Sequence, residues 1–148
     1  MSNLVLEIRP GEMMIVNGAS IRFRTKTRLE LAARARFLFG RQIMGPHEAD
    51  SPARRIYFAL QTAYIGTEEE REAGLTEART LIGAFQEATT SPLAREILDR
   101  ALQAAEADDC YQALKLARRI IRHEDAVLGR VTSIAASSQP EPSNACRP

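Results

Sequence analysis

The sequence is poor in the residues that carry most enzyme and metal chemistry. Its 148 residues include no tryptophan, two histidines and two cysteines. His47 and His123 lie far apart in sequence, and neither Cys110 nor Cys146 has a partner at zinc-ligand spacing. No nucleophile–base motif and no glycine-rich phosphate loop occurs. We therefore expect a protein that is not an enzyme and that needs no metal, cofactor or disulfide.

Long apolar runs are also missing. No stretch of the chain approaches the roughly 20 apolar residues that are needed to span a bilayer. The first residues lack the basic segment and apolar core of a secretory signal. These absences predict a cytoplasmic protein that does not associate with a membrane.

Charge is abundant but unevenly distributed, although the whole chain has a net charge of +1. Residues 1–45 hold eight basic and three acidic residues, a net of +5, and the remainder holds 12 and 16, a net of −4. A basic module joined to an acidic one suggests that the first faces a polyanion and the second a protein. Alternatively, arginine simply fills the solvent face of a sheet. The basic residues of this segment are Arg9, Arg22, Arg24, Lys26, Arg28, Arg34, Arg36 and Arg41.

The first 44 residues have the alternation that is typical of β-strands. Residues 4–9 alternate apolar and polar side chains, and Asn17-Gly18 is a strong hairpin signal. Residues 21–24 alternate as well, which predicts a strand with Arg22 and Arg24 about 7 Å apart on one side. Residues 28–39 could be strand by period or helix by composition, and we favour strand, with a break near residues 32–33.

From Ser51 onward the period changes to that of helices. Helix boundaries are predicted at Ser51-Pro52, Gly66, Thr67 to Glu70, Ser91-Pro92, and Asp108 or Asp109. The core-facing residues are predicted to be Ile56, Ala59, Leu60, Ala63, Leu75, Ala78, Ile82, Phe85, Leu93, Ile97, Leu98, Ala101, Leu102, Ala105, Leu114, Ala117, Ile121 and Leu128.

These patterns predict an α+β protein, in which a small N-terminal antiparallel β-sheet or barrel of about five strands precedes a C-terminal bundle of about four helices. We expect a basic β module at 1–44, a linker at 45–50, a helical module at 51–130 and a disordered tail at 131–148.

Two groups of residues are candidates for binding. Arginine forms planar, bidentate contacts with phosphate and stacks on bases, so the arginines of the β module are candidate ligands for a polyanion. Arg118, Arg119 and Arg122 late in the last helix suit the helix dipole without any partner. The predicted RNA-binding residues are Arg9, Arg22, Arg24, Arg34, Arg36 and Arg41. The predicted protein-partner residues, taken as surface residues of the first helix, are Arg54, Arg55, Tyr57 and Phe58.

Four segments resemble the FlbT family of flagellar regulators. They are Leu6–Glu12, Ile15–Gly18, Ala49–Ala59 and Asp109–Leu114. The resemblance implies a post-transcriptional regulator that associates with the 5′ untranslated region of flagellin mRNA, represses its translation and favours its decay. It also implies a FlaF-like protein, and possibly flagellin, as partners. An adaptor that binds those proteins and affects the messenger indirectly is the alternative.

A weaker resemblance links residues 4–44 to the CsrA family of translational regulators. Arg9, Gly11-Glu12, Arg41 and Ile43 occupy comparable places, whereas Pro10 departs from that family's pattern. The resemblance implies a homodimer in which two subunits share strands and place Arg9 and Arg41 at each edge.

Overall fold

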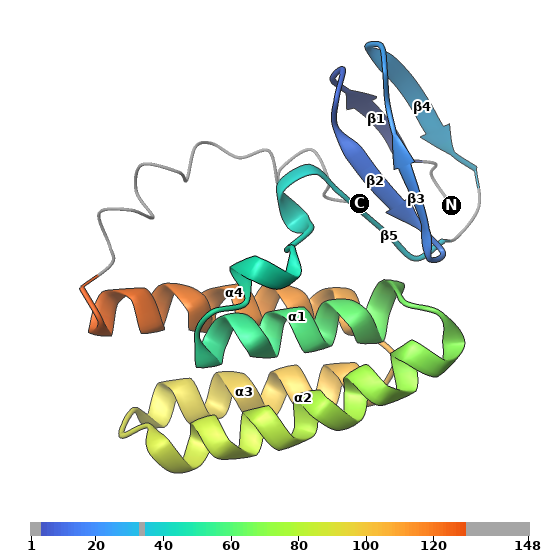
Figure 1. Cartoon of the computed structure of the whole chain (residues 1–148). Coiled ribbons are helices and arrows are strands. Elements are labelled where there is room, and N and C mark those ends of the chain that lie inside the picture. Colours follow the sequence, from blue (N-terminus) through green and yellow to red (C-terminus); the bar gives the residue numbers. More distant parts are fainter. Residues whose placement is uncertain (1–3, 33–34, 130–148) are drawn as a thin grey trace. The chain divides into compact units, whose positions relative to one another are not determined.

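The computed structural model describes residues 4–32 and 35–129. The chain divides into two compact units, whose described parts are residues 4–32 and 35–43, the β unit, and 44–129, the helical unit (Figure 1). Strands fill the first unit and helices the second, which confirms the predicted α+β class. Arg34 and the predicted tail lie outside the described residues.

The β unit contains two small antiparallel sheets. The strands are β1 (Leu4–Ile8), β2 (Met13–Val16), β3 (Ala19–Arg22), β4 (Thr27–Leu31) and β5 (Phe37–Phe39). One sheet pairs β1 with β4, and the other has the order β3-β2-β5. Leu6 and Ile8 of the first sheet share one buried cluster with Met14 and Phe39 of the second. Burial of these side chains stabilises the unit by about 1.5–3 kcal/mol each.

The predicted hairpin at Asn17-Gly18 is confirmed. Both residues have positive φ, 51° and 88°, as a two-residue type I′ turn requires. Asn17 also fixes the start of β5, because its Oδ1 accepts the Arg36 N–H at 2.9 Å and its own N–H donates to the Arg36 carbonyl at 2.7 Å. One asparagine therefore closes a turn and anchors a strand that follows it by many residues.

Three details of the β unit differ from the prediction or refine it. β3 ends at Arg22, so Arg24 lies in a bend and does not share a strand face with Arg22. Within the segment 28–39, residues 28–31 belong to β4 and residues 37–39 to β5, so the preference for strand over helix and the expected split are confirmed. Leu38 is fully buried although it has the parity of the polar residues, and its neighbour Phe39 is buried too, so parity alone does not separate the two sides of β5.

The helical unit contains α1 (Pro52–Ile65), α2 (Glu68–Ala88), α3 (Pro92–Glu106) and α4 (Cys110–Val127). Two short 3-10 helices precede α1: η1 (Gly40–Gln42) lies in the β unit and η2 (Pro46–Glu48) in the helical unit. The predicted caps are confirmed: the side chains of Ser51, Thr67, Ser91 and Asp109 each accept a backbone N–H of the first helical turn. Such a cap contributes about 1 kcal/mol.

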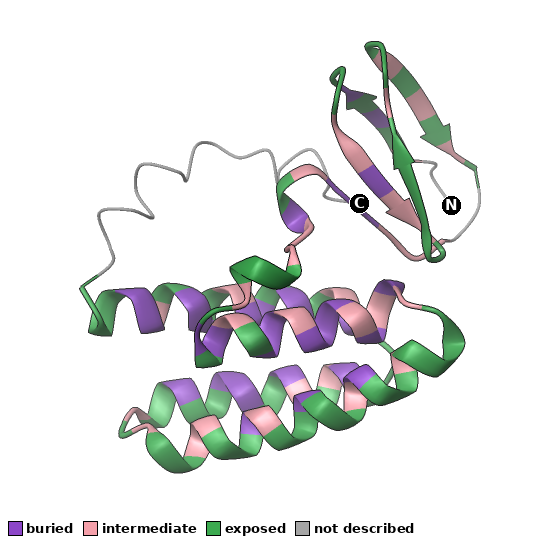
Figure 2. Ribbon diagram, viewed as in Figure 1, coloured by how far each residue is buried: buried purple, intermediate pink, exposed green. Residues whose placement is uncertain are grey.

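The predicted apolar stripes mostly form the core of the helical unit (Figure 2). Ile56, Leu60 and Leu98 are fully buried. Leu93 and Leu128 were predicted to face the core but are 60% and 56% exposed. Both lie at helix ends, where the 3.6-residue period no longer fixes which residues a neighbouring helix covers. Within residues 4–32 and 35–129, no helix is long and apolar enough to cross a membrane.

α1 and α2 approach each other closely at Gly74. A Cβ atom on Gly74 would lie 2.8 Å from the backbone nitrogen of Ala63 and 2.9 Å from the carbonyl oxygen of Ala59. Both atoms belong to the α1 backbone and cannot move aside singly. The close crossing of α1 and α2 therefore requires glycine, which has no side chain, at position 74.

Candidate functional site

Four basic residues gather at the end of the β unit where the chain turns from β1 into β2. The Gly11 N–H donates to the Phe23 carbonyl at 2.6 Å, and the Phe23 N–H donates to the Glu12 carbonyl at 3.0 Å. These bonds hold the turn after Arg9 against the segment that follows β3. The pairing of Ile8 with Thr27 brings the residue before β4 to the same end. We call Arg9, Arg22, Arg24 and Lys26 the cationic end.

The cationic end is exposed and locally ordered. All of its side chains are exposed. Arg22 Nη1 donates to the Gly11 carbonyl at 3.2 Å, which restrains its guanidinium over the turn. The nearby Glu12 accepts the Arg9 backbone N–H through Oε1 at 2.9 Å, so this carboxylate also stabilises the turn. Grouped cations on a small unit create a positive potential that attracts a polyanion.

The remaining predicted RNA-binding arginines are placed differently. Arg36 is half-buried beside Asn17, at the opposite end of β2, roughly 13 Å along the strand direction. Arg41 is exposed in η1 and follows Gly40, on which a Cβ would lie 3.4 Å from Glu12 Oε2. Thus Arg9, Arg22 and Arg24 lie at the same end of the β unit. Arg41 follows a glycine that lies near that end, and Arg36 lies at the opposite end of β2. Lys26, which strand parity did not single out, lies with Arg9, Arg22 and Arg24.

The predicted protein-partner residues separate into two pairs. Tyr57 is 3% exposed, so its expected place on the surface is wrong, and the Arg54 guanidinium is held by an ion pair. Arg55 is exposed and Phe58 half-buried. Both line an open hollow of about 280 Å³ between α1 and α2. Its other lining residues are Ala49, Ala59, Thr62, Glu70, Ala73, Gly74 and Glu77.

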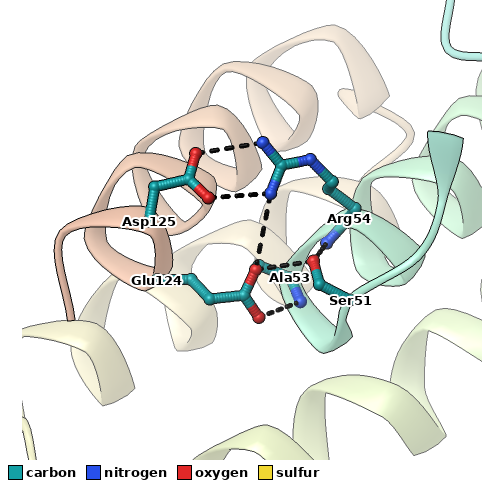
Figure 3. Close-up of polar contacts among 5 residues, drawn as sticks. All are labelled: Ser51, Ala53, Arg54, Glu124 and Asp125. Carbon is teal, nitrogen blue, oxygen red and sulfur yellow. Dashed lines mark hydrogen bonds and ion pairs between the residues drawn. The ribbon is translucent and has the colours of Figure 1, made fainter. Parts of the chain in front are cut away.

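A buried polar cluster joins the start of α1 to the end of α4 (Figure 3). Arg54 donates two parallel hydrogen bonds to Asp125, at 2.9 and 3.0 Å. Glu124 accepts the Ser51 hydroxyl at 2.6 Å and the Ala53 N–H at 3.0 Å. Ser51 in turn accepts the Arg54 N–H, so the N-cap and the ion pair form one network.

The polar cluster has the burial expected of a structural contact. Asp125 is 1% exposed, Glu124 6% and Ser51 4%. The hydrogen bonds to Asp125 raise the pKa of the Arg54 guanidinium, partly opposed by burial. The free N–H groups and dipole at the start of α1 also favour the Glu124 carboxylate. The cluster fixes one helix end on another.

Sequence analysis missed Glu124 and Asp125, yet a signal was present. Acidic residues near a helix C-terminus are disfavoured by the helix dipole. Two adjacent acids in the last turns of a basic helix therefore indicate a compensating partner. That partner comes from the first turn of α1, within the segment Ala49–Ala59 that carried the family resemblance.

The comparisons with known proteins decide the family. The family model "Flagellar protein FlbT" matches residues 4–128, which include both the cationic end and the polar cluster. The chain belongs to the FlbT family. This confirms the resemblance drawn from the four sequence segments. The weaker likeness to the CsrA family stays a prediction.

Curated FlbT proteins resemble this chain over between half and nearly all of their length. The "Flagellum biosynthesis repressor protein FlbT" of Caulobacter vibrioides is 31% identical over 131 residues, 88% of this chain and 92% of the relative. The "Probable flagellum biosynthesis repressor protein FlbT" of Mesorhizobium japonicum is 28% identical over 142 residues, 94% of each chain. The protein of the same name from Brucella ovis is 38% identical over 80 residues, 54% of this chain and 53% of the relative. No solved structure matches.

Proposed function

We propose that this protein represses flagellum biosynthesis in the cytoplasm by binding the 5′ untranslated region of flagellin mRNA. The observation that carries the proposal is the cationic end, where Arg9, Arg22, Arg24 and Lys26 lie exposed around one turn. The names of the curated relatives supply the process, flagellum biosynthesis, and the sign, repression.

The proposed mechanism is occupancy and involves no chemical step. Guanidinium groups pair with phosphates through their planar fork, so affinity should fall steeply with salt. Specificity comes from unpaired bases in the leader, because side chains do not read the deep, narrow major groove of duplex RNA. A protein bound over the ribosome-binding site blocks initiation and leaves the messenger to cellular nucleases.

The double variant Arg9→Gln/Arg24→Gln tests the cationic end. It is expected to bind a flagellin leader RNA about tenfold more weakly at low salt and to reduce the salt slope by about 1.4, the value for two lost phosphate contacts. Fluorescence anisotropy across a salt titration measures both quantities, with a scrambled RNA as reference. Both side chains are exposed, so helical and strand circular dichroism should not change.

The matched control is Arg79→Gln/Arg100→Gln. It also removes two positive charges, but from arginines already paired with Glu106 and Glu96. We expect its affinity to stay near that of the wild type. If both double variants bind the RNA equally weakly, the loss of affinity reflects net charge alone. If Arg9→Gln/Arg24→Gln binds as the wild type, these arginines do not contact the RNA.

The second candidate is an adaptor that binds a FlaF-like protein or flagellin. The hollow between α1 and α2 favours it, because a half-buried ring, Phe58, lies there beside Arg55 and the acids Glu70 and Glu77. Such a mixed lining fits one apolar side chain with a charged neighbour.

Ala73→Leu tests the adaptor. Ala73 is exposed and lines the hollow, so a larger side chain occupies the space without removing a core contact. The variant is expected to keep its melting temperature and lose at least about tenfold in affinity for a FlaF-like protein or flagellin, measured by calorimetry. Ala84→Leu, an exposed change elsewhere on α2, is the control. Unchanged affinity in Ala73→Leu would remove the hollow from consideration.

A further inference from the structure

The solvent face of α4 is basic, although the helical unit as a whole is acidic. Residues 44–129 hold ten basic and fifteen acidic residues, a net charge of −5. The two acids of α4, Glu124 and Asp125, are buried and face α1. The residues of α4 that are partly or fully exposed are Tyr111, Gln112, Lys115, Arg118, Arg119, Arg122, His123, Ala126 and Val127. Four cations therefore stand together with no acid among them.

The helix dipole does not account for this face. The dipole favours cations in the last turn of a helix and falls off beyond it. α4 ends at Val127, and its last turn contains no Lys or Arg. Lys115 and Arg119 lie two or more turns before that end. The earlier interpretation of Arg118, Arg119 and Arg122 as partners of the dipole is therefore insufficient.

Cross-helix contacts with α1 hold one edge of the basic face in place. Arg118 Nη2 donates to the Tyr57 hydroxyl at 3.0 Å, and its guanidinium lies 5.5 Å from the centre of the same ring. Two turns earlier in α4, the rings of Tyr111 and Tyr64 meet at 6.2 Å between centroids. The buried Tyr57 therefore orients the Arg118 side chain and does not contact a partner itself.

Three cations of the face, Lys115, Arg119 and Arg122, are exposed. Lys115 Nζ lies 5.6 Å above the Tyr111 ring, which places a cation beside a half-exposed aromatic surface. Arg119 and Arg122 are exposed, and neither forms an ion pair with any residue in the described part of the chain.

We propose that the outer face of α4 is a second RNA-binding surface, which takes a single-stranded segment of the same messenger. The inference rests on the proposed function and adds a contact surface to it. Lys115, Arg119 and Arg122 contact phosphates, Tyr57 positions Arg118 for the same task, and Tyr111 offers its ring to a base.

RNA fits this face better than an acidic protein does. Single strands bind where cations alternate with rings on which bases stack, whereas an acidic helix would need no exposed ring. From Lys115 to Arg122 the face extends roughly 10 Å along the helix. That length corresponds to about three stacked nucleotides at about 3.4 Å each.

The experiment uses the full chain and two probes, an oligouridine of about 20 nucleotides and a flagellin leader RNA. Arg119→Gln/Arg122→Gln is expected to weaken binding of both RNAs about tenfold at low salt and to lower the salt slope by about 1.4. Arg79→Gln/Arg100→Gln, with the same charge change, is expected to bind as the wild type. Tyr111→Leu is expected to weaken binding about tenfold, whereas Tyr111→Phe, which keeps the ring, does not. Circular dichroism and melting temperature confirm that each variant is folded.

The outcomes separate this proposal from the proposed function. If Arg9→Gln/Arg24→Gln weakens binding and the α4 variants do not, the α4 surface is wrong and the cationic end stands. If the α4 variants alone weaken binding, the cationic end is wrong and the α4 surface stands. A wild-type protein that binds neither RNA overturns both. Light scattering serves as a further check, since loss of a dimer in Arg119→Gln/Arg122→Gln without loss of RNA affinity would assign the face to a second copy of the chain.

Discussion

Arg54→Met is expected to lower the free energy of unfolding by about 3 kcal/mol, because it removes the partly buried partner of a fully buried carboxylate. The Asp125 carboxylate, 1% exposed, would lose both guanidinium hydrogen bonds and keep its charge in a site that water does not reach. Methionine retains most of the side-chain volume, so the loss reports the charge and not a cavity. Urea denaturation followed by helical circular dichroism measures the change.

Two further variants sharpen the Arg54 experiment. Arg100→Met removes an exposed arginine whose pair with Glu96 lies in solvent, and it should cost no more than about 0.5 kcal/mol. The double variant Arg54→Met/Asp125→Leu removes both charges and is expected to recover most of the lost stability. If Arg54→Met and Arg100→Met are equally stable, the polar cluster does not hold α1 to α4.

Gly74→Ala is expected to destabilise the helical unit by about 2–3 kcal/mol, although alanine is the better helix former. The added Cβ would lie 2.8 Å from the Ala63 nitrogen and 2.9 Å from the Ala59 carbonyl oxygen. Because both atoms belong to the α1 backbone, α2 must move away from α1. Separation of the two helices also loosens the packing of Ala78, which is fully buried. Thermal melting shows directly whether the substitution raises or lowers the stability.

The matched control for Gly74→Ala lies on the same helix. A Cβ on Gly83 would have no neighbour within 4 Å, so Gly83→Ala gains helix propensity without a clash. We expect it to stabilise the protein by about 0.5–1 kcal/mol. The two substitutions are chemically identical and should have opposite signs. The same sign in both would mean that α1 and α2 are not in backbone contact at Gly74.

The local structure of this protein could be predicted from its sequence because single cap and turn residues determine where helices and hairpins begin and end. Ser51-Pro52, Thr67 with Glu70, and Asn17-Gly18 each act through contacts a few residues away, and each was placed correctly. Strand parity located Leu6 and Ile8 in the core for the same reason. Errors occurred at the ends of elements: strand parity failed at Arg24, just after β3, and the helical period failed at Leu93 and Leu128, at helix ends.

The candidate sites were harder to predict because they depend on contacts between distant segments. Composition could count the arginines of the β unit, but the two backbone bonds between Gly11, Glu12 and Phe23 decide which of them meet. Likewise, nothing near Tyr57 in the sequence indicates that Arg118 covers its ring. Pattern analysis therefore found the charge of the site and missed its geometry.

The polar cluster also bears on the order in which the helical unit folds. Ser51 and Glu124 are separated by 73 positions, whereas α1 with α2 and α3 with α4 form helical hairpins through short connections. The closure of so long a loop is entropically unfavourable until the hairpins have formed. Contacts made after the transition state govern how fast a protein unfolds, not how fast it folds. Ser51, Arg54, Glu124 and Asp125 are thus expected to set the lifetime of the native bundle, while the hairpins set the speed of its formation.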